Sequence, residues 1–152
     1  MAAWVEIEAA APELAKEARA FLDAHVHKTL ATLRKDGSPR ISGTECKFAA
    51  GELWFGSMAG ALKARDLQRD PRFGLHSGSD DPPEWNGDTK IAGRAEELTD
   101  PAKWEEVYGE GQDGAHLFRA DVTEVSVVKV ADGGLVITSW HEGRGVSEIR
   151  RS

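Results

Sequence analysis

Two basic side chains, Lys63 and Arg65, occupy the beginning of a helix that the sequence predicts after Gly60. The helix dipole places about half a positive charge at this end, so acidic side chains are preferred there by roughly 0.3–1 kcal/mol. Basic side chains become favourable when an anion binds, because free backbone N–H groups, the dipole and the ammonium group then point at one phosphate. The alternative is that both side chains lie in solvent or pair with Asp66 and Asp70. The spacing alone supports the two interpretations equally.

The histidines His25 and His27 form a His-x-His pair. His25 continues the apolar face of a predicted helix, so the two rings point to different sides. No Cys, Asp or Glu follows at the spacing of a metal-binding motif, and no metal site is predicted. The serines and the lone Cys46 lack a Gly-x-Ser-x-Gly elbow or another nucleophile motif, so hydrolase chemistry has no support.

Trp140 ends the last predicted strand and is followed by a glycine-containing bend and then by Arg150. A tryptophan beside such a bend can form one wall of a pocket for a flat ligand. The alternative is a core tryptophan followed by a frayed tail. The residues alone favour this alternative slightly.

The chain of 152 residues is about the size of one domain and provides one core of ordinary size. With 40% hydrophobic and 30% charged residues, it has the composition of a globular protein. The net charge of -7 argues against general nucleic-acid binding, because a phosphate backbone requires a basic surface. No apolar run approaches the roughly 20 residues of a membrane span, and the first residues do not form a secretory signal. Together with the lone cysteine, these features predict a cytoplasmic protein that binds neither nucleic acid nor membrane.

Apolar periodicity and turn residues divide the chain into short strands and helices. The predicted helices are Pro12 to His25, Ala61 to Arg69 and Pro101 to Tyr108. The predicted strands are Thr29 to Leu33, Arg40 to Phe48, Leu53 to Ser57, Arg72 to Ser77, Thr89 to Leu98, Ala120 to Val130 and Leu135 to Trp140. An irregular alternation at Glu124–Val125 predicts a β-bulge.

These elements predict a single, mainly β domain over residues 1–152. The first three strands follow one another without room for a crossover helix, so the sheet is antiparallel there. Short, closely spaced antiparallel strands usually close into a barrel or sandwich, which removes exposed strand edges. We therefore expect an antiparallel barrel of about six to seven strands, with two or three helices packed outside.

Four segments resemble the pyridoxamine 5′-phosphate oxidase-like split-barrel superfamily of flavin and deazaflavin proteins in their order and spacing. They are Thr-Leu-Ala-Thr-Leu-x-x-Asp-Gly-Ser-Pro-Arg at 29–40, Leu-Trp-Phe-Gly-Ser at 53–57, Leu-Lys-Ala-Arg-Asp-Leu-x-Arg-Asp-Pro-Arg at 62–72, and Trp140 to Arg150. The resemblance covers roughly Phe21 to the C-terminus and is greatest to small bacterial members. It implies a split barrel that forms a homodimer with two cofactor sites across the subunit interface.

The resemblance also implies roles for individual residues. The first strand would line the flavin or deazaflavin ring, Ser57 and Lys63 would hold the cofactor phosphate, and the strand end at 76–77 would reach in from the other subunit. The implied cofactor-binding residues are Ala31, Thr32, Leu33, Ser57, Lys63, Arg65, Arg69, Ser77, Trp140 and Arg150. The dipole argument and the resemblance agree on Lys63.

The sequence departs from the oxidase itself at two places. Leu62 stands where the oxidase commonly has a second cationic phosphate ligand, which weakens phosphate binding or leaves this role to Arg65. Val146 and Glu148 stand where the oxidase has an arginine and a histidine for the substrate's phosphate, and a glutamate repels a phosphorylated substrate. The sequence therefore argues against oxidation of vitamin B6 and for another redox reaction or none.

We expect an oxidoreductase that binds FMN, or alternatively the deazaflavin coenzyme F-420, and transfers a hydride to or from a small, flat, conjugated substrate. The cofactor ring carries the redox chemistry, and the protein supplies position and electrostatics. His76 is the best candidate proton donor. Two alternatives remain: a non-catalytic module that binds or sequesters flavin, haem or a similar ligand, and a structural dimer whose site has decayed.

Overall fold

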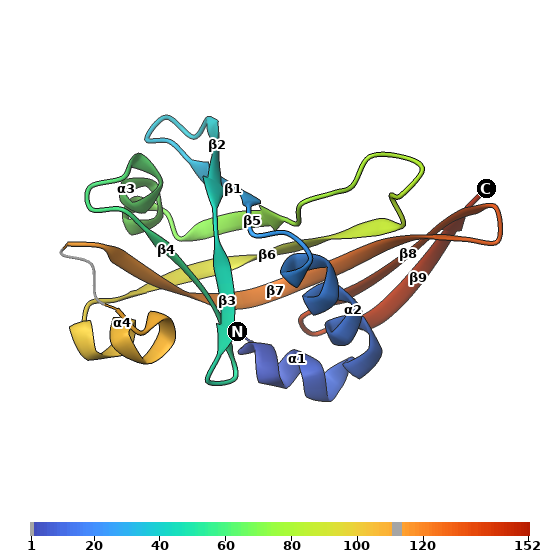
Figure 1. Cartoon of the computed structure of the whole chain (residues 1–152), viewed down its shortest axis with the longest axis horizontal. Helices are drawn as coiled ribbons and strands as arrows, with labels where there is room; N and C mark the ends of the chain where they lie inside the picture. The colour runs from blue at the N-terminus through green and yellow to red at the C-terminus, as the bar shows by residue number, and fades with distance from the viewer. Residues whose placement is uncertain (1, 111–113) are drawn as a thin grey trace.

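The computed structural model describes residues 2–110 and 114–152, which contain nine strands and four helices (Figure 1). The helices are α1 (Trp4–Ala10), α2 (Pro12–Asp23), α3 (Leu62–Arg69) and α4 (Pro101–Tyr108). The strands are β1 (Lys28–Leu33), β2 (Pro39–Thr44), β3 (Cys46–Ala49), β4 (Glu52–Ser57), β5 (Arg72–His76), β6 (Gly87–Leu98), β7 (His116–Ala131), β8 (Gly134–His141) and β9 (Gly145–Arg151). The predicted antiparallel β class with outer helices is confirmed, with more elements than expected.

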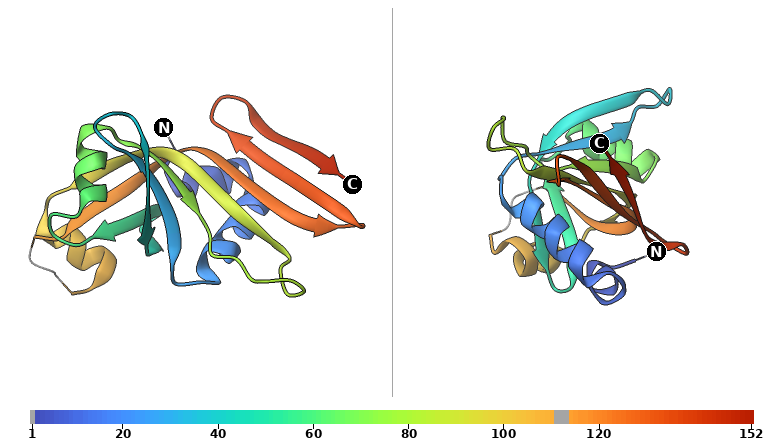
Figure 2. Two further views of the ribbon diagram at one scale, coloured as in Figure 1. Left: turned by 90° about the horizontal axis from the view of Figure 1, so that it is seen from above. Right: turned by 90° about the vertical axis from the view of Figure 1, so that its right-hand side faces the viewer.

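The described strands form one antiparallel sheet in the order β2-β1-β5-β6-β7-β4-β3, with β8 added beside β7 and β9 beside β8. One edge of β7 is shared between two neighbours, because residues 116–120 pair with β4 and residues 124–131 pair with β8. Only Glu45 separates β2 from β3, so the two ends of the strand order are joined and the sheet curves into a split barrel. The β8–β9 hairpin extends away from this barrel (Figure 2).

A β-bulge separates the two halves of β7. The register shifts between Ala92 and Gly93 of β6, and Thr123 is the extra residue on β7. A bulge bends a strand and increases its twist, which here directs β7 from β4 toward β8. A Cβ at Gly93 would lie 2.1 Å from the carbonyl oxygen of Asp121, so the close approach requires glycine. The bulge predicted at Glu124–Val125 is therefore present one residue earlier.

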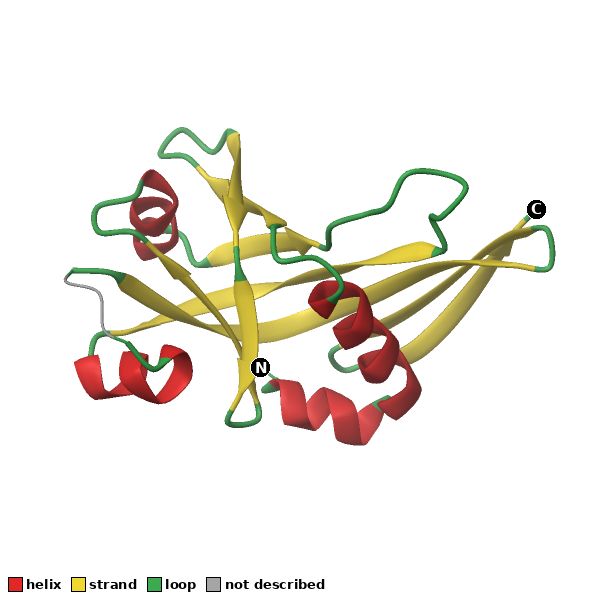
Figure 3. Cartoon of the chain, in the orientation of Figure 1, coloured by secondary structure: helices red, strands yellow, loops and turns green. Residues whose placement is uncertain are grey.

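The main hydrophobic core fills the barrel and the space beneath α1 and α2. The rings of Phe55 and Phe73 meet edge to face with centroids 5.3 Å apart. The amphipathic face of α2 contributes Leu14, Ala18 and Leu22, as the periodicity predicts. α3 and α4 lie toward one end of the molecule, and α1 and α2 lie together nearer its middle (Figure 3). None of the helices in the described ranges is long and apolar enough to cross a membrane.

The sequence prediction omitted α1 and β9. α1 is seven residues long and directly precedes Pro12, which begins the next helix. Burial of Trp4 and Ile7 in the main core holds α1, and such a tertiary contact leaves little local signal. β9, predicted as a pocket wall or a frayed tail, pairs with β8 along its length and is exposed throughout.

The predicted strand from Arg40 to Phe48 is two strands, β2 and β3. β2 pairs with β1, and β3 pairs with β4. The chain changes partner at Glu45 without a glycine or proline to mark the corner. Because an extended segment keeps its alternation through such a corner, the pattern does not reveal the break.

Candidate functional site

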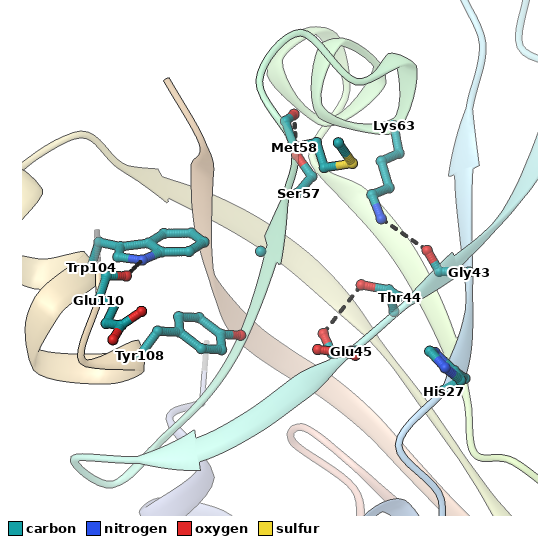
Figure 4. Close-up of a pocket in the computed structure, with 11 residues that line it drawn as sticks. His27, Gly43, Thr44, Glu45, Ser57, Met58, Lys63, Trp104, Tyr108 and Glu110 are labelled. Atoms are coloured by element: carbon teal, nitrogen blue, oxygen red, sulfur yellow. Dashed lines mark hydrogen bonds between the residues drawn. The ribbon is translucent and has the colours of Figure 1, made fainter. Parts of the chain in front are cut away.

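A cavity of about 570 Å³ opens between the β2–β3 corner, β4, α3 and α4 (Figure 4). This volume is within the roughly 300–1,000 Å³ of small-molecule and cofactor sites. We call it the first cavity. Its lining residues are His27, Gly43, Thr44, Glu45, Gly56, Ser57, Met58, Lys63, Trp104, Tyr108 and Glu110. Ser57 and Lys63, both predicted to hold a cofactor phosphate, are therefore brought together.

Lys63 extends from the first turn of α3 toward the β2–β3 corner (Figure 4). Its ammonium group donates a hydrogen bond to the carbonyl oxygen of Gly43 at 2.8 Å. Partial burial lowers the pKa of Lys63 below its usual range, because removal from water disfavours the charged form. Within the described part of the chain, Lys63 pairs with neither Asp66 nor Asp70, whose partners are arginines. Its charge therefore has no carboxylate partner at the cavity.

The start of α3 supplies further groups that suit an anion. Its N-cap residue is Ala61, whose methyl group cannot accept a hydrogen bond from the first helical N–H groups. The buried hydroxyl of Ser57 lies at the same end of the cavity and contacts the carbonyl oxygen of Met58 at 3.4 Å. An ammonium group, uncapped N–H groups and a hydroxyl match the chemistry of a phosphate. These residues fit a phosphate-bearing cofactor.

Asp66 anchors α3 to β1 and β2, and it is 1% exposed. Its carboxylate accepts hydrogen bonds from the Thr32 hydroxyl at 2.8 Å and from Nε of Arg40 at 2.7 Å, while Arg69 lies 3.5 Å away. Burial alone would raise the pKa of this carboxyl, but the hydrogen bonds and the two guanidinium charges outweigh burial and lower it. An ionised carboxylate therefore fixes the helix that carries Lys63.

Aromatic and acidic side chains line the part of the first cavity that faces Lys63 (Figure 4). Trp104 and Tyr108 lie one turn apart on α4, with ring centroids 4.9 Å apart. Gly56 makes room for the indole, because a Cβ there would lie 3.0 Å from the Trp104 ring. Glu110 follows α4, and Glu45 comes from the β2–β3 corner. Sequence reasoning missed all four; the only local signal was the run of aromatic and acidic residues at 104–110.

The Tyr108 hydroxyl is an unsatisfied polar group. It is buried and has no hydrogen-bond partner among the described residues. Burial, together with the neighbouring Cys46 and Glu45, raises the pKa of Tyr108, so the hydroxyl stays protonated. Buried polar groups without a partner are rare in folded proteins, which makes this one a candidate for a functional role.

A second cavity, of about 350 Å³, lies on the outer face of β1, β5 and β6. It contains Ala31 and His76, two further predicted site residues. Nδ1 of His76 lies 2.6 Å from the carbonyl oxygen of the next residue. The two cavities border one backbone pair of the β1–β2 ladder, since Thr29 lines the second and its partner Gly43 lines the first.

Three more predicted site residues form hydrogen bonds within the barrel. The Ser77 hydroxyl accepts a hydrogen bond from the backbone N–H of Thr89 at 3.1 Å. The carbonyl oxygen of Leu33 accepts one from Arg69 at 3.2 Å. Thr32, as described, donates to Asp66. Their side chains line neither cavity, so their predicted contacts with a cofactor ring or phosphate stay predictions.

The predicted residues Arg65, Trp140 and Arg150 lie outside both cavities as well. Arg65 is exposed on α3. Trp140 is 8% exposed and belongs to the main core, which agrees with the core interpretation of this tryptophan. Arg150 lies on β9, where Glu148 is within 3.7 Å of its guanidinium group. The single chain therefore does not bring the tail to the Lys63 end of the first cavity.

The His-x-His pair separates as expected. His25 lies 3.1 Å from Asp80, and His27 lines the first cavity. In residues 2–110 and 114–152, no group of three or more His, Cys, Asp and Glu side chains is arranged to hold a metal ion.

The architecture and the first cavity together define a split-barrel protein with a lysine at one corner of a cofactor-sized cavity. Residues 14–132 match the family model described as Pyridoxamine 5'-phosphate oxidase. The match covers well over half of the chain, and the chain belongs to this family. No curated protein matches the sequence.

Three solved structures share the fold. A pyridoxamine 5'-phosphate oxidase-related, FMN binding protein from Nostoc punctiforme is 15% identical, with a TM-score of 0.66 over 96% of this chain and 96% of that chain. PhzG from Burkholderia lata, in complex with tetrahydrophenazine-1-carboxylic acid, is 12% identical, with a TM-score of 0.70 over 97% of this chain and 92% of that chain. ChuZ from Campylobacter jejuni is 15% identical, with a TM-score of 0.71 over 91% of this chain and 63% of that chain. At these identities the similarity shows the fold.

Proposed function

We propose that this chain is a flavin-binding protein whose first cavity holds FMN by its phosphate. The observation that carries the proposal is the Lys63 end of the cavity, where a lysine without a carboxylate partner among the described residues meets the uncapped start of α3 and the Ser57 hydroxyl. The helix dipole and free N–H groups favour a phosphate at such a place. The FMN-binding relative from Nostoc punctiforme supports a flavin. The deazaflavin coenzyme F-420 is the alternative cofactor.

The proposed activity is oxidoreduction of a small conjugated molecule. A bound flavin or deazaflavin would supply the hydride transfer. Lys63 and Ser57 would bind the phosphate, Asp66 would hold α3 in place, and the α4 side chains would exclude water from the substrate. Carboxylates rather than cations line the part of the cavity that faces Lys63, so a phosphorylated substrate would be repelled. We therefore propose a reaction other than vitamin B6 oxidation.

We also propose a homodimer in which a second copy covers the second cavity. Ile41 borders this cavity and is 74% exposed, and Val146 and Ile149 on β9 are more than half exposed. Exposed apolar patches of this kind mark protein interfaces. Because the cavities border one Thr29–Gly43 pair, a partner there would place the cofactor site at the subunit interface.

Sedimentation tests the dimer. The wild type is expected to sediment as a dimer and an Ile41→Asp variant as a monomer, because a charge in an apolar interface loses its water without gaining a partner. A wild type that sediments as a monomer with FMN present would contradict the homodimer.

The proposed location is the cytoplasm. Cys46 is the chain's one cysteine, and burial raises the pKa of its thiol to about 11. The thiol therefore stays protonated and unreactive. A chain that cannot form an internal disulfide has no need of an oxidising compartment. Cell fractionation with a disulfide-bonded marker checks this location.

A second candidate function is binding of a flavin or haem without turnover. His76, the predicted proton donor, lines the second cavity and not the first, and its Nδ1 already contacts a carbonyl oxygen. A general acid must lie within hydrogen-bond reach of the group that it protonates. Among the described residues, His27 is the one histidine that lines the first cavity.

Titration with FMN and with F-420, followed by assays on quinones, nitro compounds and enones, tests both candidates. The proposed activity predicts saturable binding of one cofactor and turnover of at least one substrate class. Binding without turnover would select the second candidate. Failure to bind either cofactor would overturn the flavin proposal.

A further inference from the structure

The first cavity has two chemically different parts (Figure 4). Lys63 and the start of α3 form a positive part, while Glu45 and Glu110 supply carboxylates to the part around Trp104. Neither carboxylate forms an ion pair or a hydrogen bond within the described part of the chain. Their charges therefore face the cavity without a cationic partner.

Trp104 gives this acidic part a fixed aromatic wall. Its ring packs against Gly56, and its Nε1–H donates to the carbonyl oxygen of Glu110. The polar edge of the indole is thus satisfied within the chain, and the indole lines the cavity. The Tyr108 ring lies beside it with an interplanar angle of 33°. Aromatic faces stack with flat rings.

The two observations select one class of ligand. Carboxylates without a cationic partner among the described residues attract a positive charge and repel a negative one, and because Glu45 and Glu110 are exposed, water weakens the effect without removing it. Aromatic faces add affinity for a flat ring whatever its charge. An anionic ring compound would gain the stacking but meet two like charges, so the same residues also discriminate against it.

We propose that the Trp104 part of the first cavity binds the substrate, and that this substrate is a flat aromatic compound carrying a positively charged nitrogen group. The inference rests on the proposed function, because the cofactor phosphate takes the Lys63 part. Glu45 and Glu110 are then specificity-determining residues, and Trp104 provides the stacking surface.

Three probes of nearly equal shape test this assignment: benzamidine, benzamide and benzoate, which are cationic, neutral and anionic. Each is titrated by NMR chemical shifts into the protein with and without FMN. The wild type is expected to bind benzamidine about tenfold more tightly than benzamide, and benzoate most weakly, as expected for two partly exposed charges. Equal binding of the three probes would overturn the inference.

Variants assign the preference to residues. Glu45→Gln and Glu110→Gln are each expected to weaken benzamidine binding by about threefold, and the double variant should bind benzamidine and benzamide alike. Glu105→Gln removes an exposed carboxylate of α4 that lies outside the cavity and is the matched control. Trp104→Leu should weaken all three probes by a similar factor, because stacking does not depend on their charge. A benzamidine preference that survives in the double variant would overturn the assignment.

The FMN affinity of each variant separates this inference from the proposed function. If the protein binds FMN but does not prefer benzamidine, the proposed substrate class is wrong and the flavin proposal stands. A benzamidine preference without FMN binding would uphold the charge of the cavity and overturn the flavin proposal.

Discussion

The two helices that flank the first cavity are held in different ways. α3 packs Ala64 and Leu67 into the main core, and its Asp66 is tied to Arg40 on β2 and Thr32 on β1. Breaking such a network leaves buried polar groups without partners, so α3 resists local displacement. The helix that carries Lys63 is thus a rigid support.

α4 packs instead into a small separate cluster, in which Val107 meets Trp54 and Leu117. It also carries the unsatisfied hydroxyl of Tyr108. Few buried contacts and a buried polar group without a partner give a region a lower local stability. In the proposed function, α3 would therefore hold the cofactor phosphate rigidly, whereas α4 would adapt to the substrate.

The largest expected effect comes from breaking the support of α3. Asp66→Asn leaves Arg40 and Arg69 facing an uncharged amide, and loss of one partner of a buried ion pair costs several kcal/mol. Because these arginine side chains are 22% and 39% exposed, water offsets part of the loss. We expect a loss of about 2–3 kcal/mol in the free energy of unfolding, measured with urea. A change below about 0.5 kcal/mol would contradict an ionic anchor.

The same anchor predicts a dependence on pH. The pKa of Asp66 is lowered in the folded protein, so the folded state favours the ionised form. Its contribution is therefore complete above the unfolded pKa of about 3.9 and is lost as the pH falls through the lower folded value. Urea unfolding of the wild type and Asp66→Asn should differ most near neutral pH and converge in acid. A difference in unfolding free energy that grows in acid would show that folding does not lower the pKa of Asp66.

Substitutions of two glycines at the first cavity test how α4 is held against β4. Gly56→Ala puts a Cβ 3.0 Å from the Trp104 ring, so the indole must shift, at an expected cost of about 1–2 kcal/mol. Gly43→Ala is the matched control, since nothing lies within 4 Å of its Cβ position. Thermal unfolding and the shift of the indole N–H resonance report the effect. Equal behaviour of the two variants would show that Trp104 does not rest on Gly56.

The smallest expected effect is a gain in stability. Tyr108→Phe removes the buried hydroxyl that has no partner in the described residues, which should stabilise the fold by about 1 kcal/mol. Tyr108→Leu is the comparison variant, because it removes the ring together with the hydroxyl and should destabilise the fold. Thermal unfolding of both variants measures the two effects. A loss of stability in Tyr108→Phe would show that the hydroxyl has a partner in solution.

The sequence predicts most strands, three of the four helices and the position of Lys63, because alternation, helix periodicity and dipole effects act over a few residues. It does not predict the partner of Asp66. One alternative from the sequence pairs Asp66 with a basic residue at the start of the same helix, whereas the fold brings Arg40 to it from 26 residues away. Contacts between distant elements depend on how the barrel closes, which no local pattern records.

The dependence on contacts between distant elements also explains why the sequence did not predict the aromatic and acidic part of the first cavity. Glu45 lies at a corner that the strand pattern conceals, and Trp104 lies on a helix whose sequence does not indicate which strands it faces. They come together because β4 and β7 pair and place α4 beside the β2–β3 corner. In the proposed homodimer, a second copy would cover Ala31 and His76 and place them at the subunit interface, which one chain does not show.

The most direct test of the central claim compares FMN with riboflavin, which lacks the phosphate, in the wild type, in Lys63→Gln and in the control Lys35→Gln. Charge-assisted hydrogen bonds contribute about 1.5–3 kcal/mol, so the wild type and the control should prefer FMN by about 10–100-fold. Lys63→Gln should lose most of this preference and keep its affinity for riboflavin, with little change in stability. Equal loss of both ligands, or an FMN preference that survives in Lys63→Gln, would contradict a phosphate site at the start of α3.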